Sequence, residues 1–313
     1  MPHDDGRPVQ GLAGAPISRL ITSARTAQRL PHPVIACLLA ILFEIPLLAV
    51  FLAIDSAELD PGTLVTSALA TTAVLTGVYV LYLIQVGAWV TRWERRRFGT
   101  VGLTRERAGR NLLRGAGLGV AAYLALLGLL GGLGMVETRS QPGLGWGLVV
   151  PAAVIALLGW GVQALGEEVI YRGWLLQVVA ARTGIGIGVA VSTAIFTATH
   201  FIVGEINVVL LANLVLFGVF WSLWALREGG LWGVFGWHAV TSWVSENLVV
   251  LGEGAGYGRL QDGLLLGAAE TGPDILTGGN IGLEASILTS VLLVIGIVVV
   301  TVTPLRRTSR GRG

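Results

Sequence analysis

The sequence predicts an all-α fold, a polytopic bundle of membrane-spanning helices, and three observations support that prediction. Hydrophobic residues make up 53% of the 313 residues and only 13% are charged, whereas a soluble domain has about 25% charged residues. The mean hydropathy is +0.74. Apolar runs of membrane-spanning length recur along the chain, and arginine clusters occupy alternate connections between them. This pattern indicates a chain that lies largely in lipid.

Eight apolar runs are long enough to be interpreted as transmembrane helices. Crossing about 30 Å of hydrocarbon takes about 20 predominantly apolar residues in a helix. The predicted spans are residues 34–54, 64–90, 115–135, 148–166, 185–202, 207–226, 231–251 and 285–303. Polar residues interrupt the fourth, fifth and seventh spans, which makes their limits the hardest to define.

The arginine distribution predicts the orientation of the bundle. All 21 basic residues are arginines, and 18 of them fall in inner segments when the N-terminus is placed inside. Cytoplasmic segments carry the excess of basic residues in membrane proteins, so both termini are expected to be cytoplasmic. The predicted organisation is a cytoplasmic polar tail (1–32), a transmembrane domain (33–303) and a cytoplasmic basic tail (304–313).

Composition also narrows the classes of partner. The single cysteine, Cys37, excludes an intramolecular disulfide and a thiolate-rich metal site. The isoelectric point near 9.0 does not indicate a nucleic-acid partner, because the arginines flank the spans, where membrane orientation and anionic headgroups explain them. We expect the lipid bilayer to be the partner of these charges.

Two glycine series resemble fragments of a dinucleotide-binding loop. They are Gly115-Ala116-Gly117-Leu118-Gly119 and Gly184-Ile185-Gly186-Ile187-Gly188. Neither follows a strand of a βαβ unit, which that motif requires. Small residues in transmembrane helices let helix backbones approach closely, so we interpret both series as packing surfaces.

Three charges follow the apolar run at residues 148–165, which contains no ionisable residue. Charges at membrane depth are costly and usually face a protein interior or a wet cavity. On a helix, Glu168 and Arg172 are i,i+4 neighbours that can pair. Glu167 is rotated away from them, shares its face with Gln163 and remains available for acid–base chemistry. The alternative is a structural ion-pair cluster that closes a helix end.

His200 is the first histidine that could join these acids. Gly184 marks a turn; Glu167 lies 17 residues before it and His200 lies 16 residues after it. Two antiparallel helices that meet at this turn would place the carboxylate and the imidazole level with each other. The alternative is a histidine that only packs within its span.

His238 begins a second polar stripe in the seventh span. Ser242 and Glu246 follow at i+4 and i+8 and therefore share its helix face. The stripe could line a site, or it could be a polar seam that joins helices. Glu44, alone in the first span, is either a buried pairing partner or a functional residue.

These residues together resemble the CPBP family of intramembrane proteases, which includes the Ras-converting CAAX endopeptidases and many bacterial members. The resemblance covers roughly residues 150–250 and implies a protease-like core at about 148–251 of the transmembrane domain. It rests on three motifs in order: Glu167-Glu168-x-x-x-Arg172, Phe196-x-x-x-His200, and His238 behind Gly229-Gly230-Leu231-Trp232.

The resemblance implies a role for each polar residue. Glu167 would be the general base that activates a water, and His200 would help to hold that water. Glu168 and Arg172 would form an orienting ion pair. His238 would face the developing oxyanion, where a preorganised donor stabilises the charge as it forms.

One position departs from the family pattern. The third motif usually continues with Asn four residues after its histidine, and this chain has Ser242 there. A hydroxyl reaches less far than an amide, so the oxyanion side of the site is the weaker half. Glu246 and Asn247 are the alternative residues for this side.

The sequence therefore predicts a metal-free intramembrane endopeptidase that cleaves a membrane-embedded or membrane-associated protein or peptide. Zinc is the cofactor alternative, with Glu167, His200 and His238 as ligands, although no His-Glu-x-x-His helix is present. Two other functions compete: a non-catalytic scaffold or self-immunity protein of the same family, and a proton-coupled transporter. The exclusive use of arginine suggests a GC-rich genome, and we expect a bacterial plasma membrane protein.

Overall fold

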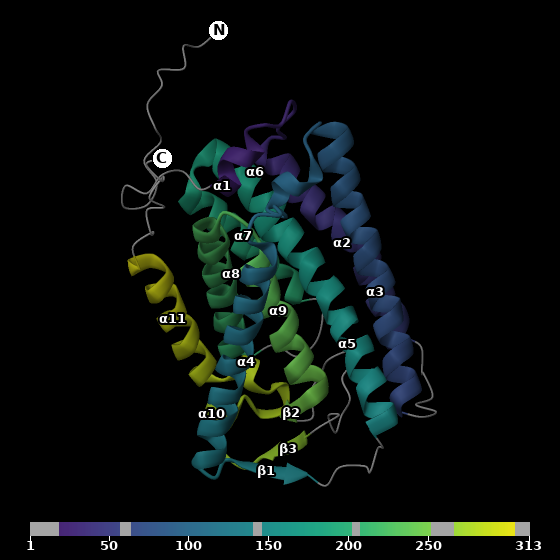
Figure 1. Cartoon of the computed structure of the whole chain (residues 1–313), viewed down its shortest axis with the longest axis vertical. Coiled ribbons are helices and arrows are strands. Elements are labelled where there is room, and N and C mark those ends of the chain that lie inside the picture. The colour runs from purple at the N-terminus through teal and green to yellow at the C-terminus, as the bar shows by residue number, and fades with distance from the viewer. Residues whose placement is uncertain (1–18, 57–63, 140–145, 202–206, 252–265, 304–313) are drawn as a thin grey trace, which may run out of the picture.

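The chain folds into a bundle of long helices with a small sheet at one end (Figure 1). The computed structural model describes residues 19–56, 64–139, 146–201, 207–251 and 266–303. The α-helices are α1 (Arg19–Ala24), α2 (Pro33–Ser56), α3 (Leu64–Ala88), α4 (Ala108–Gly132), α5 (Trp146–Glu167), α6 (Leu176–Thr183), α7 (Ile185–His200), α8 (Val208–Glu228), α9 (Trp232–Trp243), α10 (Asp274–Thr277) and α11 (Ile287–Val302). Single-turn π- or 3₁₀-helices are η2 (Trp89–Trp93), η3 (Phe98–Val101), η5 (Val244–Leu248), η6 (Gly279–Ile281) and η7 (Leu283–Ala285), and η4 (Glu168–Leu175) is a longer π-helix.

The predicted helical, multi-pass architecture is confirmed. Among the described residues, five helical segments are long and apolar enough to cross a membrane: Pro33–Val50, Thr72–Trp93, Ala108–Gly132, Trp146–Thr183 and Val208–Glu228. The helices α7 and α11 are apolar but shorter. The helices α9 and η5 lie in the remaining predicted span, 231–251. Each of the eight predicted spans thus has a helical counterpart, and the chain is a multi-pass membrane protein.

The seventh predicted span ends earlier as a helix than the sequence suggests. The helix α9 continues through η5 only to Leu248, and Val249–Leu251 form the strand β2. These three residues are as apolar as the helix before them, so hydropathy alone does not mark the change. The predicted helical limit at residue 251 was therefore wrong.

The fourth predicted span, in contrast, forms a longer helical segment than the sequence suggests. The helix does not stop at residue 166 but runs on through η4 and α6 as one apolar segment, Trp146–Thr183. The charged hexad that begins at Glu167 lies in the middle of this segment, where the helix widens into the π-helix η4. Such π-helical turns often occur at functional sites.

The basic connections gather at one end of the bundle, together with α1 and α6 (Figure 1). Arg19 of α1 pairs with Glu106 at 3.0 Å, and Arg182 at the end of α6 donates to the backbone oxygens of residues 30 and 31. This clustering supports the predicted orientation. Although the sequence suggests a polar tail up to residue 32, Leu20 and Ile21 are buried, so the described part of that tail packs against the fold.

A three-stranded sheet closes the opposite end of the bundle (Figure 1). The strand β3 (Leu266–Glu270) is central; it pairs antiparallel with β1 (Val136–Arg139) and parallel with β2. This sheet is an addition to the all-α fold that the sequence predicts. Its strands are only three to five residues long, and β1 is far from the other two strands in the sequence, so no local sequence pattern predicts their pairing.

The first glycine series lies where α4 packs against α9. A Cβ on Gly115 would collide with the backbone oxygen of Gly233, and one on Gly119 would lie 3.1 Å from the backbone oxygen of Trp237. A Cβ on Gly117 would meet no atom within 4 Å. The packing interpretation is thus correct for two of the three glycines.

Replacing Gly115 with alanine is expected to destabilise the protein by about 1–3 kcal/mol, the usual cost of overpacking a tight contact. The matched control is Gly117→Ala on the exposed side of the same helix, which is expected to be neutral or slightly stabilising because alanine has the higher helix propensity. Thermal unfolding of the detergent-purified variants measures both effects. Equal melting temperatures for the two variants would contradict the contact between α4 and α9.

Candidate active site

Glu168 binds two partners through one oxygen. Its Oε1 accepts a hydrogen bond from Nη1 of Arg172 at 3.0 Å and lies 3.0 Å from Nδ1 of His238. Glu168 and Arg172 are both fully buried, and their i,i+4 spacing is the one the sequence predicts. Because a carboxylate only accepts, Nδ1 of His238 carries the proton of this contact. Glu168 therefore fixes the ring of His238 as well as the guanidinium.

Glu167 has one oxygen held and the other directed at a histidine. Its Oε1 accepts from the hydroxyl of Tyr79 at 2.9 Å and from Nε2 of Gln163 at 3.3 Å. Its Oε2 lies 3.9 Å from Nε2 of His238. The shared face with Gln163 is the predicted one. The 3.9 Å gap is longer than a hydrogen bond, so these two atoms can both interact with a third group placed between them.

His200 reaches this region from α7, as the turn at Gly184 predicts. The helices α7 and η4 pack against each other. Ser192 of α7 donates to the backbone oxygen of Tyr171 in η4 at 2.7 Å, and Thr199 lies 3.0 Å from the Tyr171 hydroxyl. Glu167 is close enough to interact electrostatically with the imidazole. No hydrogen bond joins these two side chains among the described residues; Nδ1 of His200 instead contacts the Phe196 backbone oxygen at 2.8 Å.

The contact with Phe196 determines which nitrogen of His200 is available. A carbonyl oxygen is an acceptor, so Nδ1 carries the proton. In the neutral ring, Nε2 is then an acceptor that can receive a hydrogen bond from water. This protonation is what the predicted water-holding role requires.

Aromatic rings surround the Arg172 guanidinium. Its central carbon lies 4.2 Å from the centre of the Phe196 ring and 5.0 Å from that of Trp221. Nε and Nη2 of Arg172 have no hydrogen-bond partner among the described residues, so cation–π contacts replace part of their solvation. The Trp221 ring also stacks on His238, with centroids 4.4 Å apart and planes at 24°.

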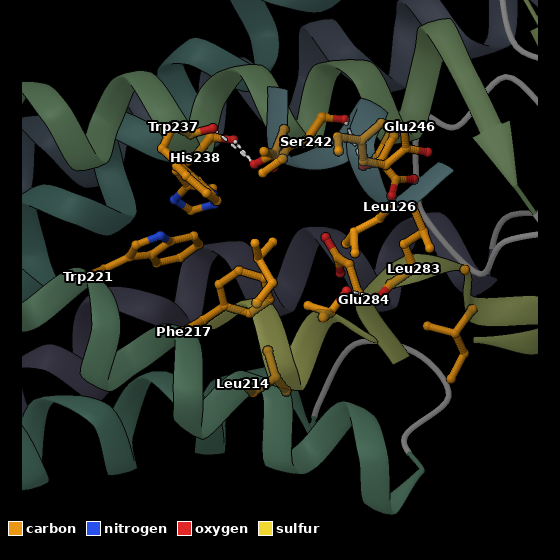
Figure 2. A pocket seen from close by; sticks show the side chains of 18 of the residues that line it. Leu126, Leu214, Phe217, Trp221, Trp237, His238, Ser242, Glu246, Leu283 and Glu284 are labelled. Carbon is orange, nitrogen blue, oxygen red and sulfur yellow. Dashed lines mark hydrogen bonds between the residues drawn. The ribbon is translucent and has the colours of Figure 1, made fainter. Parts of the chain in front are cut away.

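A cavity of about 110 Å³ begins beside these rings and runs toward the sheet end of the bundle. Figure 2 shows His238 and Trp221 at one end of the cavity, and Glu246 and Glu284 at the other, with Ser242 on the wall near its middle. His200 also lines it, whereas Glu167 does not. Glu167 therefore lies behind the cavity wall, with its Oε2 3.9 Å from Nε2 of His238, which is part of that wall.

Of the three residues considered for the oxyanion side of the site, two line the cavity and one does not. Ser242 and Glu246 both line the cavity. Asn247 is buried outside it, where its Oδ1 accepts from Nε1 of Trp160 at 2.5 Å. Asn247 is therefore engaged in packing the bundle and is not placed to replace the expected Asn.

Three tyrosines that were not among the predicted site residues support the acids. Tyr79 holds Glu167, and the hydroxyls of Tyr82 and Tyr171 both donate to Oε1 of Glu44. Glu44 is thus a hydrogen-bonded partner in the first span, which is one of its two predicted alternatives. The available signal was the spacing of Tyr79 and Tyr82, whose three-residue separation puts two hydroxyls on one face of an apolar span.

The predicted zinc alternative has no assembled ligand set. Among the described residues, no group of three or more His, Cys, Asp and Glu side chains could hold a metal ion. Nδ1 of His200 and Nδ1 of His238 are each engaged by an oxygen acceptor. The metal-free mechanism remains a prediction, since only an experiment with chelators tests it.

The comparison with known proteins agrees with the motifs. Residues 147–244 match a family model described as type II CAAX prenyl endopeptidase Rce1-like. No curated protein and no solved structure matches the chain. The matched segment contains the acid pair, Arg172, both histidines and Ser242, and it confirms the predicted resemblance to CAAX-type intramembrane proteases over this part of the chain.

Proposed function

Because residues 147–244 are Rce1-like in sequence, we propose that this multi-pass protein is an intramembrane endopeptidase in which Glu167 is the general base. The observation that supports it most strongly is the geometry of that carboxylate. One oxygen is fixed by Tyr79 and Gln163, and the other is directed at His238. A side chain that only closed a helix end would not need one oxygen held in place and the other presented to an imidazole.

The proposed reaction is the hydrolysis of a peptide bond. A water bound between Glu167 and Nε2 of His200 gives a proton to Oε2 of Glu167, and its oxygen attacks the carbonyl carbon. Nε2 of His238, when protonated, donates a hydrogen bond to the resulting oxyanion. Glu167 then returns the proton to the departing amine nitrogen as the C–N bond breaks. The products are a carboxylic acid and an amine, and no metal is required.

The ion pair has an orienting role in this proposal. Glu168 binds Nδ1 of His238 and Nη1 of Arg172 through the same oxygen, so the ring cannot rotate without breaking a fully buried contact. Its Nε2 consequently stays directed toward Glu167. Glu168 itself does not contact the reacting atoms.

The substrate class follows from where the site lies. The charged residues lie within a helix long enough to span the bilayer, and the cavity beside them has largely apolar walls. We propose a membrane-embedded or membrane-associated protein or peptide as substrate. A bacterial plasma membrane is the proposed location, based on the arginine-only basic residues and their placement.

One observation favours a second candidate function. Ser242 stands where the family usually has Asn, and Glu167 does not line the cavity. A protein that kept the fold but lost cleavage, such as a membrane scaffold or self-immunity protein, would show both features.

The metal-dependent alternative has a separate test. Inhibition of cleavage by 1,10-phenanthroline that added zinc reverses would support it.

The test is a comparison of protein N-termini in membranes of wild-type and Glu167→Ala cells. A set of N-termini is expected to disappear in the variant, because their formation needs the general base. Glu106→Ala is the matched control: that carboxylate is 64% exposed and pairs with Arg19 outside the site. An unchanged set of termini in the Glu167→Ala strain, with the variant present at normal level, would reject the protease function.

A further inference from the structure

Six of the ten tryptophans donate their indole N–H to an acceptor within the described part of the chain. An indole N–H donates and cannot accept, and buried tryptophans usually find an acceptor for it. The described residues follow this rule at six positions. The donor and acceptor pairs are Trp89 and Glu94, Trp160 and Asn247, Trp174 and Glu94, Trp224 and Glu228, Trp232 and Thr104, and Trp243 and Ala153.

Among the described tryptophans, Trp221 is the one whose Nε1 atom is itself buried and has no acceptor. The residue is only 4% exposed, and its Nε1 has no hydrogen-bond partner among the described residues. Buried polar groups without a partner are rare in native structures, and each one calls for an explanation. A natural explanation is an acceptor that arrives with a ligand.

The position of Trp221 indicates which ligand atom that is. Trp221 lines the cavity beside His238, and the two rings stack with centroids 4.4 Å apart. Figure 2 shows the indole and the imidazole facing each other at the same end of the cavity. The ring that carries the unpartnered N–H is therefore stacked on the imidazole that we propose as the donor to the oxyanion.

We propose that Nε1 of Trp221 is a catalytic donor that, together with His238, binds the oxygen of the scissile carbonyl as it becomes an oxyanion. This inference rests on the proposed function and deepens it. Oxyanion sites in acyl transfer use several preorganised donors in a water-excluded setting. The hydroxyl of Ser242 reaches less far than the amide of the expected Asn, so the oxyanion lacks a second hydrogen-bond donor on α9. Trp221 supplies that donor from the neighbouring helix α8.

A purely structural role for Trp221 makes a different prediction. The ring also packs against the Arg172 guanidinium at 5.0 Å, and that contact needs an aromatic face but no N–H. Phenylalanine keeps an aromatic face for Arg172 and for His238. Trp221→Phe therefore removes the proposed catalytic group while it preserves most of the packing.

The experiment measures cleavage of synthetic peptides that span the sites lost in the Glu167→Ala strain, with the full-length protein in liposomes. Trp221→Phe is expected to lower kcat by about 10²–10³-fold with little change in KM and in melting temperature. The control is Trp243→Phe, which removes an indole N–H bonded to the Ala153 backbone oxygen outside the cavity. It is expected to retain the wild-type kcat.

A second variant adds a readout that packing would not change. In the Trp221→Phe background, Ser242→Asn places an amide at the position where the family has one, and it is expected to restore kcat at least tenfold. A Trp221→Phe kcat within about twofold of wild type would overturn the proposal, as would a loss confined to KM. If Trp221→Phe gives either of these results while Glu167→Gln is inactive in the same assay, only the role of Trp221 is overturned and the proposed function stands. If Glu167→Gln remains active, the proposed function fails and this proposal fails with it.

Discussion

Replacing Glu167 with glutamine is expected to slow peptide hydrolysis by about 10²–10⁴-fold, the usual contribution of a general base. The amide has nearly the same shape as the carboxylate. Its oxygen can still accept from Tyr79 and Gln163, which now hold Oε1 at 2.9 and 3.3 Å. What the amide cannot do is take a proton from water. The loss is therefore expected in kcat, while the unfolding transition stays close to that of the wild type.

Glu167→Asp provides the graded control for this prediction. Aspartate keeps a carboxylate, but its side chain is shorter by one methylene. The carboxylate therefore lies farther from Nε2 of His238 than the 3.9 Å of the wild type. An intermediate rate is expected, because proton transfer is retained at a poorer distance. Initial rates on the peptides described above, with the variants in liposomes, provide the measurement. Glutamine and wild-type proteins that cleave at the same rate would remove Glu167 from the mechanism.

The helical bundle could be predicted because few backbone conformations are stable in lipid. Backbone groups in hydrocarbon must be hydrogen-bonded within their own segment, so an apolar run of sufficient length becomes a helix. The i,i+4 pair of Glu168 and Arg172 and the face shared by Glu167 and Gln163 are local consequences of helical geometry. The prediction that His200 approaches the region of Glu167 needed only one more assumption, an antiparallel turn at Gly184, whose φ is +97°.

The remaining features depend on contacts between distant segments. The approach of His238 to Glu168 follows from the packing of α9 against α4 and α5, in which Gly115 and Gly233 meet. The strands β1 and β3 pair Val136 with Glu270, far apart in sequence. Hydropathy records neither kind of contact. The support of Glu167 by Tyr79 was missed for the same reason, since it joins α3 to α5.

The largest effect on stability is expected from Arg172→Met. Glu168 is fully buried, and its bonded oxygen loses the guanidinium in this variant. Removing one partner of a buried ion pair usually costs about 3–5 kcal/mol, because the other charge is left without compensation. The exposed pair of Arg19 and Glu106, at 79% and 64% exposure, provides the contrast. Arg19→Ala is expected to leave the unfolding transition almost unchanged, since surface pairs are worth little.

The double variant Glu168→Gln/Arg172→Met separates the cost of the charge from that of the contact. Replacing both charges leaves no uncompensated carboxylate, so it is expected to be more stable than Arg172→Met alone. Equilibrium unfolding in mixed detergent measures the double variant and the two single variants, Arg172→Met and Glu168→Gln. A double variant as unstable as the sum of its single variants would show that the two residues do not form a coupled pair.

Cleavage by the double variant then shows what the ion pair does beyond folding. The neutral amide introduced by Glu168→Gln can still accept a hydrogen bond from Nδ1 of His238, which lies 3.0 Å from Glu168 in the wild type, but it offers no charge to hold the ring. The guanidinium that packs against Phe196 and Trp221 is also absent. We therefore expect the double variant to remain folded and to cleave at least tenfold more slowly than the wild type. A folded double variant with the wild-type rate would confine the ion pair to a structural role and leave the orientation of His238 to Trp221.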